Sequence, residues 1–397
     1  MSGRLFIFTG SFPYGYRESF LEQEINYLSK EFDQIIVFPF GGNGTKKRNL
    51  PVGVSVDESL LGSKTKKIIL GAINSWRVLP FFFSLKVLSD GKLLKKWLKS
   101  TLIVSYYLQS KGVKCLMKSL TPDDIIYYYW GVDFNLIAPF VKGKCIQISR
   151  FHGDWDLWYE GGKYEAYSPC RKQIMESINC AVTISEKGNS FLRARYPYLN
   201  IKTFRLGSID WGESQKSRDG YLRILSCSAV YPLKRVDYIF QCIKEYAQTR
   251  HKVIWTHIGD GPSFDEIRRV CVSDKLIDFQ VNLMGRLSHD KVMDYYKNNS
   301  VDIFINLSTN EGIPVSIMEA ISFNVPIVAT NVGATNEIVT EETGVLVNSN
   351  PSVDAVATAL QYIEGASLTP RYFWKNNYNA EQNYSNFARY IKTLINE

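Results

Sequence analysis

Short apolar runs alternate with longer amphipathic stretches along the whole chain, and this pattern predicts strands followed by helices. In the first half the predicted strands are Leu5–Phe8, Gln34–Pro39, Ile125–Trp130, Cys145–Arg150, Ala181–Ile184 and Ile201–Arg205. In the second half they are Leu222–Cys227, Val253–Ile258, Gln280–Met284, Ile303–Asn306 and Ile327–Ala329. Helix-like stretches such as Glu18–Lys30 and Glu186–Arg195 lie between them. The alternation predicts an α/β protein with parallel sheets covered by helices on both faces.

A polar, glycine-bearing segment, residues 206–221, separates the two series of strands and is the predicted linker. With 397 residues the chain is long enough for two domains. We therefore expect an N-terminal Rossmann-like domain at 1–205 and a second one at 222–375. The last stretch, 371–397, is predicted to form two helices.

The composition, with 45% hydrophobic and 22% charged residues, is that of a globular protein. The seven cysteines are an odd number without metal-like spacing, which is typical of thiols in a reducing cytoplasm. No signal peptide and no uncharged segment of membrane-spanning length is visible. A cytoplasmic protein is the expectation.

The net charge is unevenly distributed. Residues 1–205 hold 29 Lys and Arg against 17 Asp and Glu, whereas residues 206–397 hold 18 against 22. The cations cluster with aromatic residues between 64 and 118, at Lys66-Lys67, Trp76-Arg77, Phe81–Phe83, Lys95–Trp97 and Lys99. Helices of this composition can lie in a lipid headgroup layer, so we expect peripheral contact with the inner face of an anionic membrane. A basic face over a helical core is the alternative; nucleic acid is not expected, because no nucleic-acid-binding motif accompanies the charge.

The most informative segment is 303–347. Glu311 and Glu319 lie eight residues apart, and the turn Glu311-Gly312-Ile313-Pro314 separates an apolar run from the next helix. Pro314 suits the first turn of that helix. The N–H groups of Val315 and Ser316 would then face a phosphate or another anion at a partly positive helix end. Taken alone, one Glu near a helix start is more often a residue that caps the helix.

These residues resemble the retaining glycosyltransferases of the GT4 group. Their pattern of two glutamates with seven residues between them is met by Glu311 and Glu319, and the associated residues are Gly312, Pro314, Ala320, Pro326, Val332-Gly333, Glu337–Val339 and Gly344. The resemblance implies the GT-B fold, in which two doubly wound Rossmann-like domains face a central cleft. It also implies that a C-terminal helix, 376–397, returns to the N-terminal domain.

Lys234 and Arg235 follow the first strand of the second domain, where a cation faces the crevice in which anions bind. In the family an Arg five positions before the Lys shares the binding of the diphosphate, but this chain has Ala229 there. Arg235, where the family often has Gly, is the candidate substitute. The alternative is that Lys234 caps a surface helix.

Two further turns are expected to bind the nucleotide. Gly259-Asp260-Gly261 follows a strand, and glycine there allows a nucleotide to approach the backbone closely. In relatives the nucleobase contacts the position occupied here by Met284-Gly285-Arg286.

In the first half, His152 follows a strand that ends near Arg150, and in GT4 relatives the matching His contacts the donor sugar. Asp154-Trp155-Asp156 spells a motif that binds metal in a different glycosyltransferase fold; we interpret it as coincidence and expect no metal cofactor. The loop with Gly10, Ser11, Gly15 and Glu18, next to Arg17, is expected to face the donor phosphates and the acceptor.

The resemblance implies a role for each of these residues. Glu319 would accept hydrogen bonds from the ribose, Glu311 would hold the sugar, and Lys234 with Arg235 would stabilise the departing diphosphate. His152 would position the sugar. The expected donor is a nucleotide-diphosphate sugar carrying a hexose, and the expected acceptor is a glycan or lipid-linked saccharide of a surface polysaccharide. Two alternatives are a catalytically silent nucleotide-sugar-binding subunit and, less favoured, a GT-B epimerase or phosphorylase.

Overall fold

The computed structural model describes residues 3–15, 18–42, 47–79, 91–153, 156–159, 164–165, 168–250, 252–273 and 278–396. Three features discussed above lie outside these residues: Arg17, the pair Asp154-Trp155 and the run Phe81–Phe83.

The chain forms two compact units. The first comprises Met1–Leu206 together with Glu381–Glu397, and the second comprises Gly207–Ala380. The last 17 residues thus pack with the N-terminal unit. Each unit has its own parallel sheet and hydrophobic core.

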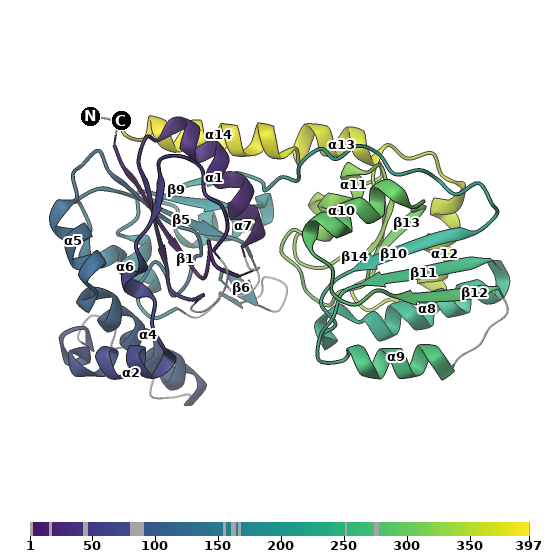
Figure 1. Ribbon diagram of the computed structural model, residues 1–397, viewed down its shortest axis with the longest axis horizontal. Coiled ribbons are helices and arrows are strands. Elements are labelled where there is room, and N and C mark those ends of the chain that lie inside the picture. Colours follow the sequence, from purple (N-terminus) through teal and green to yellow (C-terminus); the bar gives the residue numbers. More distant parts are fainter. Residues whose placement is uncertain are drawn as a thin grey trace. The chain divides into compact units, whose positions relative to one another are not determined.

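The sheet of the first unit has seven parallel strands in the order β3-β2-β1-β4-β5-β8-β9 (Figure 1). These strands are β1 Leu5–Thr9, β2 Ile35–Pro39, β3 Val54–Val56, β4 Ile125–Tyr128, β5 Ile146–Phe151, β8 Cys180–Thr183 and β9 Asn200–Thr203. A small hairpin, β6 Trp158–Tyr159 and β7 Tyr164–Glu165, is separate. The strand order reverses between β1 and β4, so ligands are expected at the carboxyl ends of these two strands.

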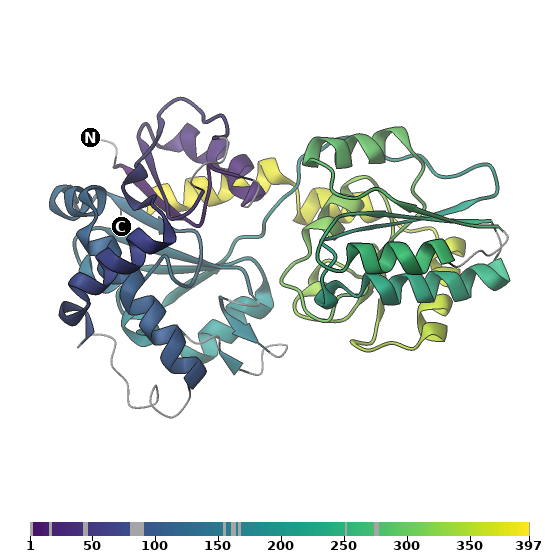
Figure 2. The same cartoon turned by 60° about the horizontal axis from the view of Figure 1, so that its bottom comes forward.

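Helices cover both faces of this sheet (Figure 2). The helices of this unit are α1 Ser19–Glu31, α2 Lys64–Ile73, α4 Gly91–Gln109, α5 Lys111–Ser119, α6 Arg171–Met175, α7 Glu186–Arg195 and α14 Ala380–Thr393. Because side chains alternate along a strand, Leu5 and Ile7 pack with buried residues of α1 and α14. Phe6 and Phe8 pack on the other face, with residues of α4 and α5.

The second unit repeats the design with six parallel strands in the order β12-β11-β10-β13-β14-β15. They are β10 Leu222–Cys227, β11 Val253–Ile258, β12 Phe279–Leu283, β13 Ile303–Asn306, β14 Ile327–Thr330 and β15 Gly344–Val347. The helices are α8 Val236–Arg250, α9 Phe264–Ser273, α10 His289–Asn298, α11 Val315–Ser322, α12 Val353–Gly365 and α13 Pro370–Asn377. The order reverses between β10 and β13, which places the expected ligand edge after these strands.

The predicted α/β fold class is confirmed, and every predicted strand is present with ends shifted by at most two residues. The elements not predicted are β3, β15 and the β6–β7 hairpin. β3 is a three-residue edge strand that is not fully buried, and β15 begins with a glycine, so neither shows a clear apolar run. Within the described ranges, none of the helices is both long enough and apolar enough to cross a membrane.

Candidate functional site

The segment with the two glutamates folds as the sequence predicts, from a buried strand through a turn into a helix. β13 ends at Asn306, and α11 begins at Val315 with Pro314 in extended conformation as its N-cap. The N–H of Met318 donates to the carbonyl of Pro314 at 3.2 Å. The N–H groups ahead of Met318, including those of Val315 and Ser316, therefore have no acceptor within the helix and can bind an anion.

Lys234 and Glu311 form an ion pair at the ligand edge of this sheet. Lys234 ends the short 3-10 helix Pro232–Lys234 after β10, and its Nζ lies 2.6 Å from Oε1 of Glu311. The side chains are 24% and 11% exposed, so the pair is only partly screened by water. The Nδ2 of Asn306 donates to the same carboxylate oxygen at 3.2 Å. The pair thus holds one positive and one negative group side by side.

The turn that contains Glu311 packs against the loop after β14. Gly333 has a left-handed φ of +55°, and a Cβ there would lie 1.6 Å from the carbonyl oxygen of Glu311. The N–H of Ala334 donates to the carbonyl of Gly312 at 3.3 Å. Only glycine allows the two main chains to approach this closely. Gly333 therefore allows the Glu311 turn to lie directly against the loop after β14.

Glu319 is on α11 and is paired with His289, the first residue of α10. Oε1 of Glu319 and Nε2 of His289 are 3.0 Å apart, with side-chain exposures of 12% and 38%. The ring of Trp211 lies 6.5 Å from the imidazole. His289 was not predicted as a site residue, because it shares no local motif with Glu319. The only available signal was that histidine is rare in this chain, with four in 397 residues.

Arg235 lies between the loops after β13 and β15. It adopts a left-handed φ of 46°, where the family often has glycine. Its guanidinium donates to the carbonyl oxygens of Leu307 at 2.6 Å and Ser349 at 2.7 Å. Burial lowers the pKa of this group. In this structure its donors hold the loops after β13 and β15. That Arg235 replaces the missing diphosphate-binding arginine stays a prediction.

The two turns predicted to bind the nucleotide are joined to each other. A Cβ on Gly259 would lie 1.8 Å from the carbonyl oxygen of Ser228, and one on Gly261 would lie 2.5 Å from that of Val230. The N–H of Gly259 donates to the carbonyl of Gly285 at 2.9 Å. These glycines therefore let the loops after β10, β11 and β12 pack together, with Asp260 and Arg286 in the same loops.

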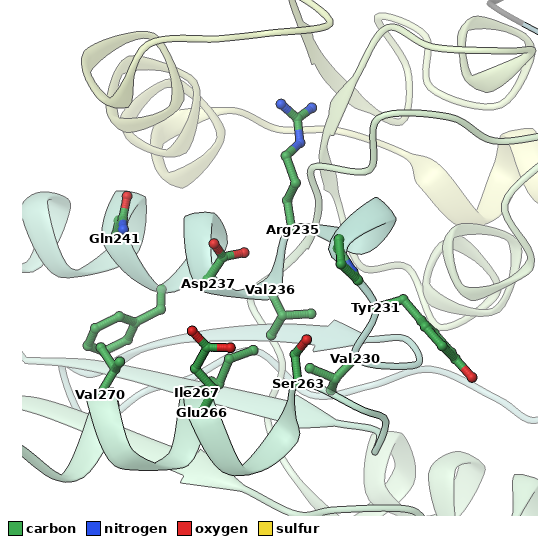
Figure 3. A pocket seen from close by; sticks show the side chains of 12 residues that line it. Val230, Tyr231, Arg235, Val236, Asp237, Gln241, Ser263, Glu266, Ile267 and Val270 are labelled. Atoms are coloured by element: carbon green, nitrogen blue, oxygen red, sulfur yellow. The ribbon is translucent and has the colours of Figure 1, made fainter.

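A cavity of about 370 Å³ lies on the α8 and α9 side of the Val230–Pro232 loop (Figure 3). It is lined by residues of that loop, α8 and α9, among them Asp237 and Glu266, and by Ser263 just before α9. Lys234, Glu311 and Glu319 are not part of its lining. In Figure 3 the side chain of Arg235 extends away from Ser263 and Ile267. We do not assign this cavity to the donor.

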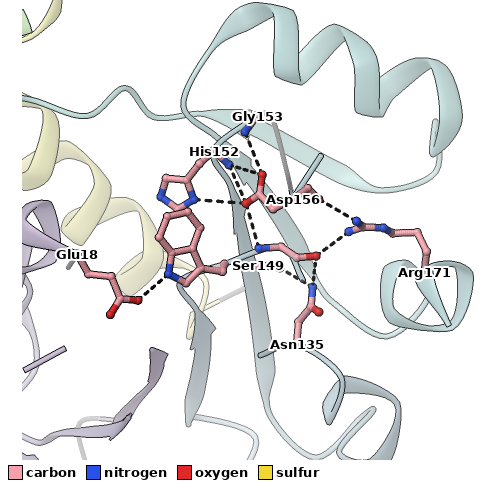
Figure 4. A network of polar contacts seen from close by, with 9 residues as sticks. Glu18, Asn135, Ser149, His152, Gly153, Asp156 and Arg171 are labelled. Atoms are coloured by element: carbon pink, nitrogen blue, oxygen red, sulfur yellow. Dashed lines mark hydrogen bonds and ion pairs between the residues drawn. The ribbon is translucent and has the colours of Figure 1, made fainter. Parts of the chain in front are cut away.

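In the first unit, His152 belongs to a network built around Asp156 (Figure 4). The buried carboxylate of Asp156 accepts the main-chain N–H groups of His152 and Gly153 at 3.0 Å. One of its oxygens also lies 3.4 Å from Nδ1 of His152. The imidazole packs on the ring of Trp130 at 4.2 Å. Asp156 thus acts as an acceptor that orders the His152 loop, and among the described residues no cluster of three or more His, Cys, Asp or Glu suits a metal.

The carboxylate of Glu18 forms hydrogen bonds with the main chain of the loop that follows β1. It accepts the N–H groups of Gly10, Ser11 and Phe12, each at 2.7 Å, and the indole N–H of Trp130 at 2.6 Å. Glu18 thus binds the main-chain N–H groups of this loop. That the loop faces the donor phosphates and the acceptor stays a prediction. Gly15, with φ +68°, follows in the same loop and accepts a hydrogen bond from Arg48 through its carbonyl.

The structure therefore brings Lys234, Glu311, Glu319 and the start of α11 together in the second unit, and His152 with the Glu18 loop in the first. The prediction that His152 reaches the sugar held by the second unit stays a prediction.

Comparison with known proteins supports this assignment of the fold. Residues 209–380 match the family model described as Glycosyl transferases group 1. Over 147 residues the chain is 29% identical to the phosphatidylinositol N-acetylglucosaminyltransferase GPI3 subunit of Saccharomyces cerevisiae (strain YJM789), covering 37% of this chain and 32% of that protein. The chain thus matches about a third of the length of this curated relative.

Two solved structures share the fold over nearly the whole chain. The apo form of the lipopolysaccharide outer core galactosyltransferase WaaB superimposes with a TM-score of 0.64 at 15% identity, covering 98% of this chain and 99% of that one. Anabaena HepE in complex with UDP gives a TM-score of 0.64 at 15% identity, covering 98% and 100%. The GT-B fold and the resemblance to GT4-like glycosyltransferases are confirmed.

Proposed function

We propose that this protein is a retaining, metal-independent glycosyltransferase that moves a hexose-type sugar from a nucleotide-diphosphate donor to a glycan or lipid-linked saccharide at the cytoplasmic face of a membrane. The observation that supports it best is the position of the Lys234–Glu311 pair, Glu319 and the start of α11 at one ligand edge of the second unit. This edge is where doubly wound sheets bind nucleotides.

The diphosphate of the donor is the part of the substrate that these groups suit best. It carries close to two negative charges, which a lysine ammonium and main-chain N–H groups at a helix start can share. Charge on the leaving oxygen grows as the bond to the sugar breaks. Lys234 and the N–H groups of Val315 and Ser316 would therefore bind the transition state more strongly than the ground state.

The roles of the carboxylates come from the resemblance. Glu319 would accept hydrogen bonds from the ribose hydroxyls, while Glu311 would hold the sugar beside its anomeric carbon. His152 would position the sugar from the other unit. In the proposed reaction the bond from the anomeric carbon to the diphosphate breaks and the acceptor hydroxyl attacks the same face. Its proton passes to the leaving phosphate oxygen.

The names of the similar proteins agree with the proposed substrates. One relative is named for N-acetylglucosamine transfer to phosphatidylinositol, one structure for galactose transfer to lipopolysaccharide, and one contains UDP. They support a UDP-sugar as the first donor to test and an amphiphilic saccharide as acceptor.

The test begins with a thermal-shift panel of nucleotide sugars, because a bound donor raises stability by RT ln(1 + [L]/Kd). The donor that stabilises the protein is then incubated with lipid-linked saccharides, and the product is analysed by NMR. We expect the anomeric configuration of the donor in the product. An inverted product would refute the retaining assignment.

A second candidate is a catalytically silent subunit that binds the nucleotide sugar within a glycan assembly complex. The observation that favours it is the shortage of cations: Ala229 replaces the usual arginine, and Arg235 is engaged with carbonyl oxygens. This candidate predicts donor binding in calorimetry with neither hydrolysis nor transfer. It also predicts that Glu311→Ala changes binding alone.

A further inference from the structure

One side of α2 is an exposed apolar surface. Ile68, Ile69 and Ile73 are 48%, 55% and 59% exposed, and Trp76, in the short helix Ser75–Arg77 that follows, is 63% exposed. Ile69 and Ile73 are four residues apart, so their side chains lie one above the other on the same face of the helix. We name these four residues the α2 surface.

The opposite side of α2 is packed against the unit, so this helix is fixed in place. Gly71 is buried, and a Cβ there would lie 2.5 Å from the carbonyl oxygen of Leu102 on α4. Asn74 donates to the side-chain oxygen of Gln109 at 3.0 Å, and Gln109 donates to the carbonyl of Leu70. The helix is therefore held in place on one side, and the α2 surface on its other side is exposed.

The segment that carries the α2 surface is rich in cations. Residues 61–120 contain twelve Lys and Arg but one acidic residue, Asp90. Lys64 and Lys66 are exposed in the first turn of α2, and the guanidinium of Arg77 lies 5.1 Å from the ring of Trp76. On the neighbouring helix α4, Lys95 and Lys96 are exposed as well, while Lys99 is paired with Asp133 at 3.1 Å. An apolar strip flanked by positive charge matches the interface of a bilayer that contains anionic lipids.

We infer that the α2 surface docks on an anionic lipid bilayer, with the isoleucines and Trp76 at the boundary of the acyl chains and the lysines at the headgroup phosphates. The phosphates of a nucleic acid could pair with the lysines, but a nucleic acid provides no apolar phase in which the four half-exposed apolar side chains could be buried. This inference goes beyond sugar transfer and does not depend on it. Docking would keep an enzyme that uses lipid-linked acceptors at the membrane, where such acceptors are found.

Vesicle flotation tests the docking directly. The full chain is mixed with vesicles of phosphatidylcholine alone or with phosphatidylglycerol added. We expect binding to the anionic vesicles that weakens as salt rises, because salt screens the lysines. The double variant Ile69→Asn/Ile73→Asn should reduce binding about tenfold or more, since it removes the apolar contact. The matched control is Tyr372→Asn, at a residue 65% exposed in the second unit, which should bind like the wild type.

Charge is tested separately. Lys64→Glu/Lys66→Glu should weaken binding to anionic vesicles, whereas Lys172→Glu, at a side chain 81% exposed on α6, should not. Quenching of Trp76 by brominated lipids, taken as the difference between the wild type and Trp76→Phe, reports insertion even where a variant is unstable. Wild-type-like binding by both α2 variants, or binding to duplex nucleic acid in preference to vesicles, would overturn the inference. Donor hydrolysis in solution is measured in parallel and should be unchanged in the α2 variants, so failure of sugar transfer is seen independently.

Discussion

The ammonium of Lys234 and the carboxylate of Glu311 are 2.6 Å apart although 77 residues separate them in the chain. They meet because β10 and β13 are neighbours in the sheet, and each residue lies beyond the carboxyl end of its strand. We expect a diphosphate bound at this edge to draw the ammonium toward itself. Glu311 would then be released to accept hydrogen bonds from the sugar.

Replacement of Lys234 by Ala should therefore lower turnover more than donor binding. We expect kcat to fall by about 10² to 10³, the usual loss when one group that stabilises developing charge is removed. The matched control is Lys291→Ala, at an exposed position on α10, which should leave kcat unchanged. Initial rates with the donor found by thermal shift give both constants. Equal kcat values for the two variants would contradict the proposed role.

Local patterns were enough to predict much of the second unit. Glu311 and Glu319 are placed by one strand, one turn and one helix, all contiguous in sequence. Lys234 is placed by the rule that ligands bind where strand order reverses. Each of these inferences needs only the position of a residue within its own strand-to-helix connection.

The remaining features depend on contacts between segments distant in sequence. His289 meets Glu319 from another helix, and no spacing indicates it. Arg235 looks like a free cation in the sequence, but its left-handed backbone turns the side chain toward carbonyl oxygens of two other loops. Glu18 accepts the indole N–H of Trp130, 112 positions away, in addition to the N–H groups of its own loop.

The His289–Glu319 pair should affect the binding of the ribose. Nε2 of His289 holds Oε1 of Glu319 at 3.0 Å, which restricts the rotamers of the carboxylate. His289→Ala should weaken UDP binding about three- to tenfold, the value of one hydrogen bond. The loss should be smaller for UDP that lacks its 2′ and 3′ hydroxyls, because the ribose contact is already absent. An equal loss with both nucleotides, measured by calorimetry, would exclude this role.

Substitutions of Arg235 should act on stability. Arg235→Ala removes hydrogen bonds to Leu307 and Ser349 and keeps a strained left-handed residue. We expect it to cost about 1–3 kcal/mol in urea unfolding. Arg235→Gly loses the same bonds but relieves the strain, so it should be about 1 kcal/mol more stable than the Ala variant. The reverse order of stability would contradict this explanation. A large loss of UDP affinity without loss of stability would instead support the prediction that Arg235 binds the donor.

Gly333→Ala should disturb the Glu311 turn. The added Cβ would meet the carbonyl oxygen of Glu311 at 1.6 Å, so one of the two main chains must move. We expect a loss of at least about 2 kcal/mol in stability together with lower activity. Gly285→Ala is the control: its φ of +63° is also left-handed, but a Cβ there meets nothing within 4 Å. If the stability of the Gly333→Ala variant were no lower than that of the Gly285→Ala control, the Glu311 turn would be able to shift at little cost, contrary to this prediction.

The buried His257 should make the protein sensitive to acid. It lies on β11 with Nδ1 2.9 Å from the hydroxyl of Ser226, and burial lowers its pKa from 6.5 to about 4. The unfolded chain therefore takes up a proton between pH 6.5 and 4 while the folded protein does not. Stability is fully present above pH 6.5 and falls as the pH drops through this window, by on the order of 3 kcal/mol from this group. His257→Gln should be less stable at pH 7, because it disturbs the packing, but its stability should fall less between pH 7 and 4. Urea unfolding at a series of pH values gives the difference between the two proteins, in which the contributions of the carboxylates cancel. If the stability of the wild type and of His257→Gln fell equally with decreasing pH, His257 would not be the source of the acid sensitivity.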